Sequence, residues 1–231
     1  MPASSQSANN RISGKFQSDE LRIAILDAAE QLFLEAGIEN TAMGDIAARA
    51  GINRVTLYRY FANRDEVAVE IHIRMIKKME QTTRFAPFDT HTLVDFKLRA
   101  QLMIRNFVAL RDIYRYIGMF DKIYLDNASD SPLTRWTIAQ LIKAGFVPPH
   151  SREGSPMEPY RHQLAVMMTS MLWFLEKLAL RGEVTWSGQE FPLDEQLRIY
   201  ENMVMGYFDR LIETQNSRDH ASTSDIPSSD P

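Results

Sequence analysis

Residues 43–61 read MGDIAARAGINRVTLYRYF, and this stretch decides the fold of the N-terminal region. Ala47 lies in the middle of a first short helical pattern, and Gly51 follows where the chain must turn sharply with positive φ. Asn53 is a good N-cap for a second short helix. A small residue, a glycine turn and a second helix at these offsets are typical of a helix-turn-helix. The residues spaced to fill its small core are Ile46, Ala50, Ile52, Leu57 and Tyr60.

The same stretch concentrates positive charge on a chain that is acidic overall. Arginines recur every five residues at Arg49, Arg54, Arg59 and Arg64, and residues 46–64 contain no acid, so their local charge is +4. The whole chain carries −4. DNA binding requires a positive footprint at the groove rather than a basic protein throughout. The alternative is an ordinary pair of crossed helices with a solvated arginine face, which the acid-free window and the neighbouring threonine and tyrosines make the weaker interpretation.

Composition bounds the remaining possibilities. The chain has 231 residues, of which 45% are hydrophobic and 24% charged, enough for one or two domains with a real core. Cysteine is absent, which excludes disulfides, thiol nucleophiles and thiolate metal sites. No stretch reaches about 18 consecutive apolar residues, and residues 1–10 lack the apolar region of a secretory signal. We therefore expect a cytoplasmic protein.

Apolar residues at spacings of three and four predict an all-α fold of about nine helices. Ser18 is the predicted N-cap of the first helix, and Asn63 with Glu66 forms a capping-box pattern for a fourth helix at about residues 64–84. Residues 184–186 are too short to form a sheet. The predicted organisation is a disordered arm at 1–17, a helix-turn-helix domain at 18–66, a second helical domain at 67–215 that the fourth helix links to the first, and a disordered tail at 216–231.

Two late helices, at about residues 158–181 and 194–214, are apolar on more than one face. Such helices must be covered on both sides. One face would meet the core of the domain, and the other would meet a second subunit in a four-helix bundle across a two-fold axis. The residues expected at this dimer interface are Met171, Phe174, Met203, Tyr207 and Leu211.

Methionines and aromatic residues are frequent in the second domain. Methionine adapts to irregular surfaces and aromatic side chains line concave sites, so one interpretation is a pocket for a small apolar or aromatic ligand. Core packing is the competing interpretation for each residue taken singly. The residues predicted to line the pocket are Phe107, Phe120, Trp136 and Met168.

Catalytic and metal-binding patterns are weak. Glu158 and His162 are four residues apart on one predicted helix, the spacing of a two-ligand metal site, although a surface pair explains them more simply. The sequence has no glycine-rich phosphate loop, nucleophile elbow or HExxH motif. We therefore expect no metal, no cofactor and no enzyme activity.

Residues 24–61, followed by Asn63-Arg64-Asp65-Glu66, resemble the DNA-binding domain of the TetR family of transcriptional regulators. The resemblance covers about 50 residues. Its features are Ile25, Ala28, Ala29, Leu32 and Phe33, then Gly37 and Thr41, then Asp45-Ile46-Ala47, Ala50-Gly51-Ile52, Thr56-Leu57-Tyr58 and Tyr60-Phe61.

The resemblance implies a dimer whose second motif helix enters the major groove. Arg54 and Val55, with Arg59 nearby, match positions that face base edges, and an arginine there is suited to a bidentate contact with guanine. The fourth helix would act as the lever between ligand and DNA. The residues matching phosphate-contacting positions are Thr41, Asn53, Thr56, Tyr58, Tyr60 and Arg64.

Two residues depart from the family pattern. Ala42 stands where threonine often caps the first motif helix, so either Thr41 caps it or a cap that contributes roughly 1 kcal/mol is lost. Val55 stands where glycine is common, which favours an apolar contact with a thymine methyl group. Arg11 and Lys15 in the N-terminal arm would allow contact with a minor groove, although a disordered leader explains them as well.

These observations together predict a homodimeric TetR-like regulator that binds double-stranded DNA at a palindromic operator. Repression relieved by a small apolar or aromatic ligand is the expected mode, and activation is the alternative within the same class. The competing class is an all-helical ligand carrier or small enzyme whose N-terminal motif is a remnant. It predicts tight binding of a small molecule and no salt-dependent affinity for DNA.

Overall fold

The computed structural model describes residues 4–83, 92–125, 132, 134–136, 139, 158–181, 185–186, 189–190 and 192–224. Residues 1–3 of the predicted arm, the predicted end of the fourth helix at residue 84 and residues 225–231 of the predicted tail lie outside these residues. The sequence also predicts a helix at 132–145 and a loop at 146–156, and most of this helix and the whole loop lie outside them.

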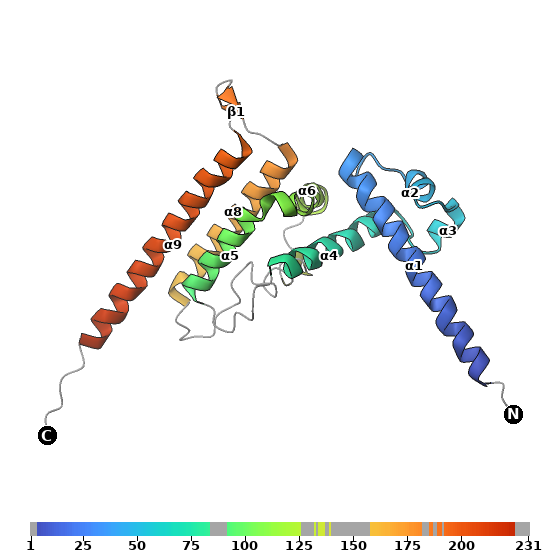
Figure 1. The fold of residues 1–231 in the computed structure, drawn as a ribbon, viewed down its shortest axis with the longest axis horizontal. Helices are drawn as coiled ribbons and strands as arrows, with labels where there is room; N and C mark the ends of the chain where they lie inside the picture. The colour runs from blue at the N-terminus through green and yellow to red at the C-terminus, as the bar shows by residue number, and fades with distance from the viewer. Residues whose placement is uncertain are drawn as a thin grey trace.

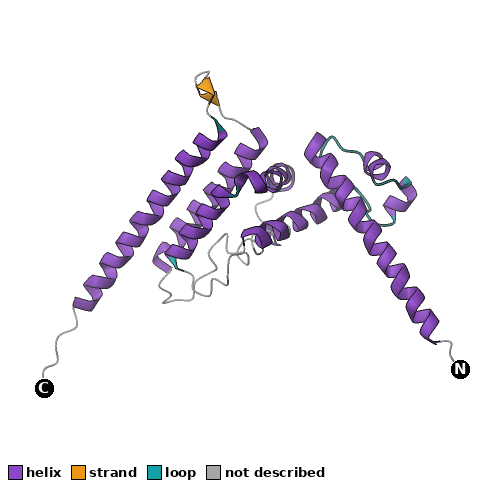
Figure 2. Cartoon of the chain, viewed as in Figure 1, coloured by secondary structure: helices purple, strands orange, loops and turns teal. Residues whose placement is uncertain are grey.

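Eight α-helices have defined bounds among the described residues, and the all-α prediction is confirmed (Figures 1 and 2). They are α1 (Ser4–Ala36), α2 (Met43–Arg49), α3 (Arg54–Tyr58), α4 (Arg64–Thr83), α5 (Leu93–Arg105), α6 (Phe107–Tyr124), α8 (Arg161–Arg181) and α9 (Leu193–Ser224), with a 3-10 turn η1 (Glu158–Tyr160) before α8. The sequence predicts that residues 184–186 are too short for a sheet. Two of them nevertheless form β1 (Thr185–Trp186), which pairs antiparallel with β2 (Gln189–Glu190) between α8 and α9.

Both end helices are longer than predicted. α1 begins at Ser4, not after Ser18, and α9 continues to Ser224. Helical backbone therefore covers most of the segment expected to be a disordered arm and the first part of the expected tail. Residues 4–17 contain no proline, and after α9 begins the next proline is Pro227, so nothing in the backbone chemistry interrupts either helix.

The helix-turn-helix forms as the local sequence predicts. Asn53 is the N-cap of α3, and its Oδ1 accepts the Thr56 N–H at 2.8 Å. Gly51 has φ of +68°, a conformation in which glycine is unstrained. Ala42 is the N-cap of α2 but makes no side-chain bond, and the Asp45 carboxylate accepts its N–H at 2.9 Å. The acid at the third helical position thus supplies part of the capping, and of the two alternatives the structure has the one in which Thr41 does not cap α2.

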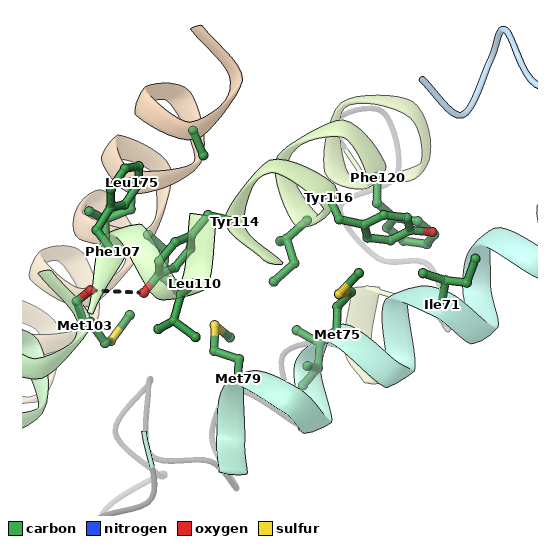
Figure 3. Packing of buried hydrophobic residues seen from close by; sticks show 14 of the residues in the cluster. Ile71, Met75, Met79, Met103, Phe107, Leu110, Tyr114, Tyr116, Phe120 and Leu175 are labelled. Carbon is green, nitrogen blue, oxygen red and sulfur yellow. Dashed lines mark hydrogen bonds between the residues drawn. The ribbon is translucent and has the colours of Figure 1, made fainter. Parts of the chain in front are cut away.

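A continuous hydrophobic core joins the two ends of the protein. It runs from α1 through α4 and α6 to α8 and includes residues of α5 and α9. In Figure 1, α4 extends from the helix-turn-helix toward the bundle of α5, α6, α8 and α9. Figure 3 shows its buried residues Ile71, Met75 and Met79 facing the aromatic residues of α6. Both predicted domains therefore share one core, with α4 between them.

The segment from Glu158 to Arg181 is long and apolar enough to cross a membrane by length and composition alone. In this fold its most apolar face is a core face, since Leu164, Met168, Met171 and Leu175 are fully buried. α8 packs chiefly against α6. Burial within the chain accounts for the apolar residues on this face of the helix.

Candidate nucleic-acid interface

α3 presents one exposed face to solvent. Leu57 points into the core with 0% of its surface exposed, whereas Val55 is 68% exposed and Tyr58 is 54% exposed. Arg54 and Arg59 are exposed at the two ends of the same short helix. Two arginines, an aromatic hydroxyl and an apolar side chain on one face match the needs of a helix that reads a major groove.

The four regularly spaced arginines have different surroundings. Arg49 forms an ion pair with Glu35 of α1 at 2.8 Å, and this contact lowers the pKa of the Glu35 carboxyl. The Arg64 guanidinium donates to the Glu39 carbonyl oxygen at 2.7 Å. Within the part of the chain that the structure describes, the side chains of Arg54 and Arg59 have no hydrogen-bond or ion-pair partner. The free positive charge is therefore concentrated at α3 and is smaller than the sequence count implies.

The predicted phosphate contacts divide into two groups. Tyr58 is exposed, and Asn53, Thr56 and Tyr60 lie at or near the surface, with the Tyr60 hydroxyl 3.4 Å from Ser18 Oγ of α1. Thr41 is only 3% exposed, and its hydroxyl donates to the Gly37 carbonyl at 2.9 Å. Its side chain therefore closes the end of α1, and the prediction that it contacts phosphate is wrong for this conformation.

Arg64 also differs from its predicted role. Its guanidinium is directed toward the loop that follows α1, and its Nε lies 3.8 Å from the Asp65 carboxylate. Asp65 in turn accepts a hydrogen bond from the Tyr124 hydroxyl of α6 at 2.8 Å. The first turn of α4 thus connects the loop after α1 with the last turn of α6.

Further contacts fix α4 against α6. The Tyr116 hydroxyl of α6 donates to the Ala68 carbonyl of α4 at 2.8 Å. The ring of His72 stacks on Phe120 with 4.0 Å between ring centroids. Burial lowers the pKa of His72 to about 4, so the ring is neutral at pH 7. These contacts give α4 a defined rotational position against α6.

Three of the four predicted pocket residues lie in the core. Phe107, Phe120 and Met168 are fully buried in the continuous hydrophobic cluster, and Trp136 is half-buried. Two surface grooves have other linings. One, of about 600 Å³, lies between α1 and α4, and the other, of about 350 Å³, lies between α8 and α9. Neither groove includes a predicted pocket residue.

The residues predicted at the dimer interface differ in how far they are buried within the chain. Met171 is fully buried against the chain's own core, so its assignment to the interface is wrong. Phe174 stacks on Tyr200 at 3.9 Å, and Met203 is 64% exposed. Tyr207 and Leu211 are half-buried. Three further exposed apolar residues lie on the same two helices and were not predicted: Val166, Trp173 and Ile199. The seven-residue spacing of Val166 and Trp173 on one helix was the available signal.

No group of three or more histidine, aspartate or glutamate side chains positioned to hold a metal ion occurs among the described residues. His162 is exposed on α8 and lines the groove between α8 and α9.

Comparison with known proteins extends this description. The family described as bacterial regulatory proteins, tetR family, matches residues 25–71. The chain is 37% identical over 57 residues to the HTH-type transcriptional regulator AcrR of Shigella flexneri, covering 25% of this chain and 26% of that protein. It is 28% identical over 98 residues to the HTH-type transcriptional activator FasR of Mycolicibacterium smegmatis, covering 42% and 43%. The matches thus span less than half the length of these relatives.

Solved structures share the whole fold. A tetR-family transcriptional regulator from Streptomyces coelicolor superposes with a TM-score of 0.54 at 17% identity, covering 92% of each chain. AibR, solved in complex with isovaleryl coenzyme A and operator DNA, gives a TM-score of 0.50 at 14% identity, covering 79% of this chain and 97% of that one. At these identities the likeness concerns the fold alone. The match to the tetR family of bacterial regulatory proteins therefore lies in the N-terminal helix-turn-helix region, residues 25–71.

Proposed function

We propose that this protein is a homodimeric, ligand-responsive transcriptional regulator that acts in the cytoplasm. Its α3 helices bind successive major grooves of a palindromic operator, and a small apolar or aromatic ligand releases it. The observation that carries the proposal is the exposed face of α3, where Arg54 and Arg59 are unpaired among the described residues beside exposed Val55 and Tyr58. The curated relatives are named as transcription regulators, which supports this class over a carrier or an enzyme.

The DNA contacts that we propose follow from exposure. Arg54, Val55 and Arg59 meet base edges, while Asn53, Thr56, Tyr58 and Tyr60 meet phosphates. Arg64 acts indirectly, because its guanidinium holds the loop after α1 in place through the Glu39 carbonyl. A palindromic operator follows from the two-fold symmetry of a dimer with two recognition helices.

The dimer that we propose uses α8 and α9. Val166, Trp173, Ile199 and Met203 expose apolar surface on these two helices, and such surface is costly to leave in water. Phe174, Tyr207 and Leu211 lie beside this surface in half-buried positions. An isologous pairing of the two helices would cover it in a four-helix bundle.

The ligand site that we propose lies among the methionines and aromatics between α4, α5, α6 and α8, near Phe107, Phe120, Met168 and Trp136. Methionine side chains have low rotational barriers and repack around irregular guests, so a buried cluster of them can open for an apolar molecule. Met75, Met79 and Met103 are fully or almost fully buried in this region (Figure 3). Since α4 borders the cluster, a guest there would shift the helix that carries the DNA-binding end. We propose repression as the mode, although FasR is named as an activator.

The test begins with selection of an operator from random duplex DNA, followed by a salt titration of the selected sequence. Affinity should fall steeply as salt rises, because each neutralised phosphate releases counterions. The variant Arg54→Ala/Arg59→Ala should lose specific binding by about 100-fold or more, since each base contact contributes about 1–3 kcal/mol. Its mass in solution should remain that of the dimer.

The matched control is Arg111→Ala/Arg115→Ala, which removes two positive charges from α6 instead of α3. It should bind the operator within about twofold of the unaltered protein, the difference expected from a remote charge at physiological salt. Equal losses in the two double variants would mean that only net charge matters, and the recognition-helix assignment would then be wrong.

A further inference from the structure

Gly44, the second residue of α2, lies directly against the side chain of Arg54 from α3. A Cβ added in ideal geometry at Gly44 would be 2.8 Å from Arg54 Cζ and 2.9 Å from Arg54 Nε, with Nη2 closer still. Non-bonded carbon contacts normally lie at about 3.5–4.0 Å. The guanidinium therefore occupies the space that the side chain of any other residue at position 44 would need.

The backbone does not explain this glycine. Among the described residues the glycines with positive φ are Gly37 and Gly51, so Gly44 has a conformation that any residue adopts. Glycine is less favourable than alanine inside a helix, and α2 is only seven residues long. The missing side chain of Gly44 leaves space for the Arg54 guanidinium, and this space is the structural reason for a glycine that is otherwise unfavourable in a helix.

We propose that Gly44 is a positioning residue for operator recognition, which holds the Arg54 guanidinium against the first turn of α2 and so determines where this arginine meets DNA. The proposal rests on the proposed function, because it concerns how the recognition helix is presented. The Arg54 side chain has no hydrogen-bond or ion-pair partner among the described residues, and its guanidinium fills the space left by the missing side chain of Gly44. Any larger residue at position 44 would displace the flexible end of Arg54 and leave the two helices in place.

The experiment is a double-mutant cycle on operator binding with Gly44→Ala, Arg54→Ala and the double variant. Gly44→Ala should weaken specific binding by about tenfold, the size of one good base or phosphate contact. The double variant should bind no more weakly than Arg54→Ala, because alanine at position 44 acts only through the arginine. Unaltered affinity in Gly44→Ala, or losses that multiply to about 100-fold in the double variant, would overturn the proposal.

A thermal-unfolding measurement on the same four proteins provides a readout that needs no DNA. Alanine at position 44 should raise the midpoint by a few degrees, about the effect of improved helix propensity, and more so when Arg54 is also alanine. If Gly44→Ala failed to fold, the double variant should fold, since the obstructing side chain would be gone. Failure of both to fold would overturn the proposal. If the unaltered protein selected no operator at all, the proposed function itself would fail, whereas operator binding with an unresponsive Gly44→Ala would refute only the positioning role.

Discussion

At the scale of single residues, the buried histidine of α4 couples stability to pH. His72 is fully buried and stacks on Phe120, and burial lowers its pKa from 6.5 to about 4. Between these two values the unfolded chain binds a proton at this position and the folded chain does not. The free energy of unfolding therefore falls as pH decreases from about 6.5 to about 4.

The shift of His72 corresponds to a stability loss of roughly 3 kcal/mol over that interval, at about 1.4 kcal/mol for each unit of pKa. We expect His72→Leu to flatten this part of the stability profile, measured by urea unfolding at a series of pH values. His162→Leu removes an exposed histidine from α8 and is the control. A profile that kept the same slope in His72→Leu would assign the acid sensitivity to other groups.

Residue-level interpretation of the sequence succeeded where the partner lies nearby in the chain. Asn53 caps α3 by accepting the Thr56 N–H, and this three-residue spacing can be read directly from the sequence. Arg49 pairs with Glu35, fourteen residues away, and Arg64 donates to the carbonyl of Glu39. Those contacts depend on how helices cross, which charge spacing does not encode. For this reason the sequence predicted four available arginines, and the structure leaves Arg54 and Arg59 on the exposed face of α3.

At the scale of elements, the turn between α2 and α3 depends on Gly51. Its φ is +68°, and a Cβ added there would meet no atom within 4 Å. Replacement therefore costs conformational energy without any steric clash. We expect Gly51→Ala to destabilise the protein by about 1 kcal/mol and Gly51→Asn to cost less, because asparagine tolerates the left-handed region better.

Thermal or urea unfolding of the Gly51 variants measures these differences. Gly206→Ala in α9 is a useful control, because it replaces a glycine inside a helix whose added Cβ would meet Arg210 Nη1 at 3.8 Å, an ordinary contact distance. Helix propensity alone predicts that this change is neutral or stabilising. Equal costs for alanine and asparagine at position 51 would contradict a conformational origin.

Helix existence was easier to predict than helix ends. The turn glycines and the periodic apolar residues placed α2, α3 and α4 correctly, because these signals are local. Ser18 has a good capping side chain, but α1 passes through it from Ser4. A cap lowers the energy of starting a helix at one residue and does not forbid an earlier start. The same reasoning applies to α9, whose polar end continues the helical backbone to Ser224.

At the scale of the whole molecule, the exposed apolar surface of α8 and α9 should hold two chains together. Trp173 is 63% exposed, and a charge in its place would be buried without a partner in a dimer. We expect Trp173→Glu to shift the protein from dimer to monomer in sedimentation measurements. We also expect operator affinity to fall, because one recognition helix binds without its partner.

Val108→Glu is the control for Trp173→Glu. Val108 is 71% exposed but lies on α6, outside the proposed interface, so its change should leave the mass unaltered. If both variants remained dimers, the interface would lie elsewhere.

The sequence indicates that α8 is apolar on two faces. It does not indicate which face is exposed, because Met171 and Trp173 are both large and apolar. Only the packing of α8 on α6 distinguishes them.

The shared core has a consequence for genetics. Because α1, α4 and α6 contribute to one hydrophobic cluster, the DNA-binding end is packed continuously against the rest of the described chain. A random screen for loss of promoter control should therefore recover substitutions at Met75, Tyr116 and Phe120 as well as on α3. Suppressors of such alleles should map to residues on the opposite side of the α4–α6 contact. The pattern of suppression would show which contacts couple the core to DNA binding.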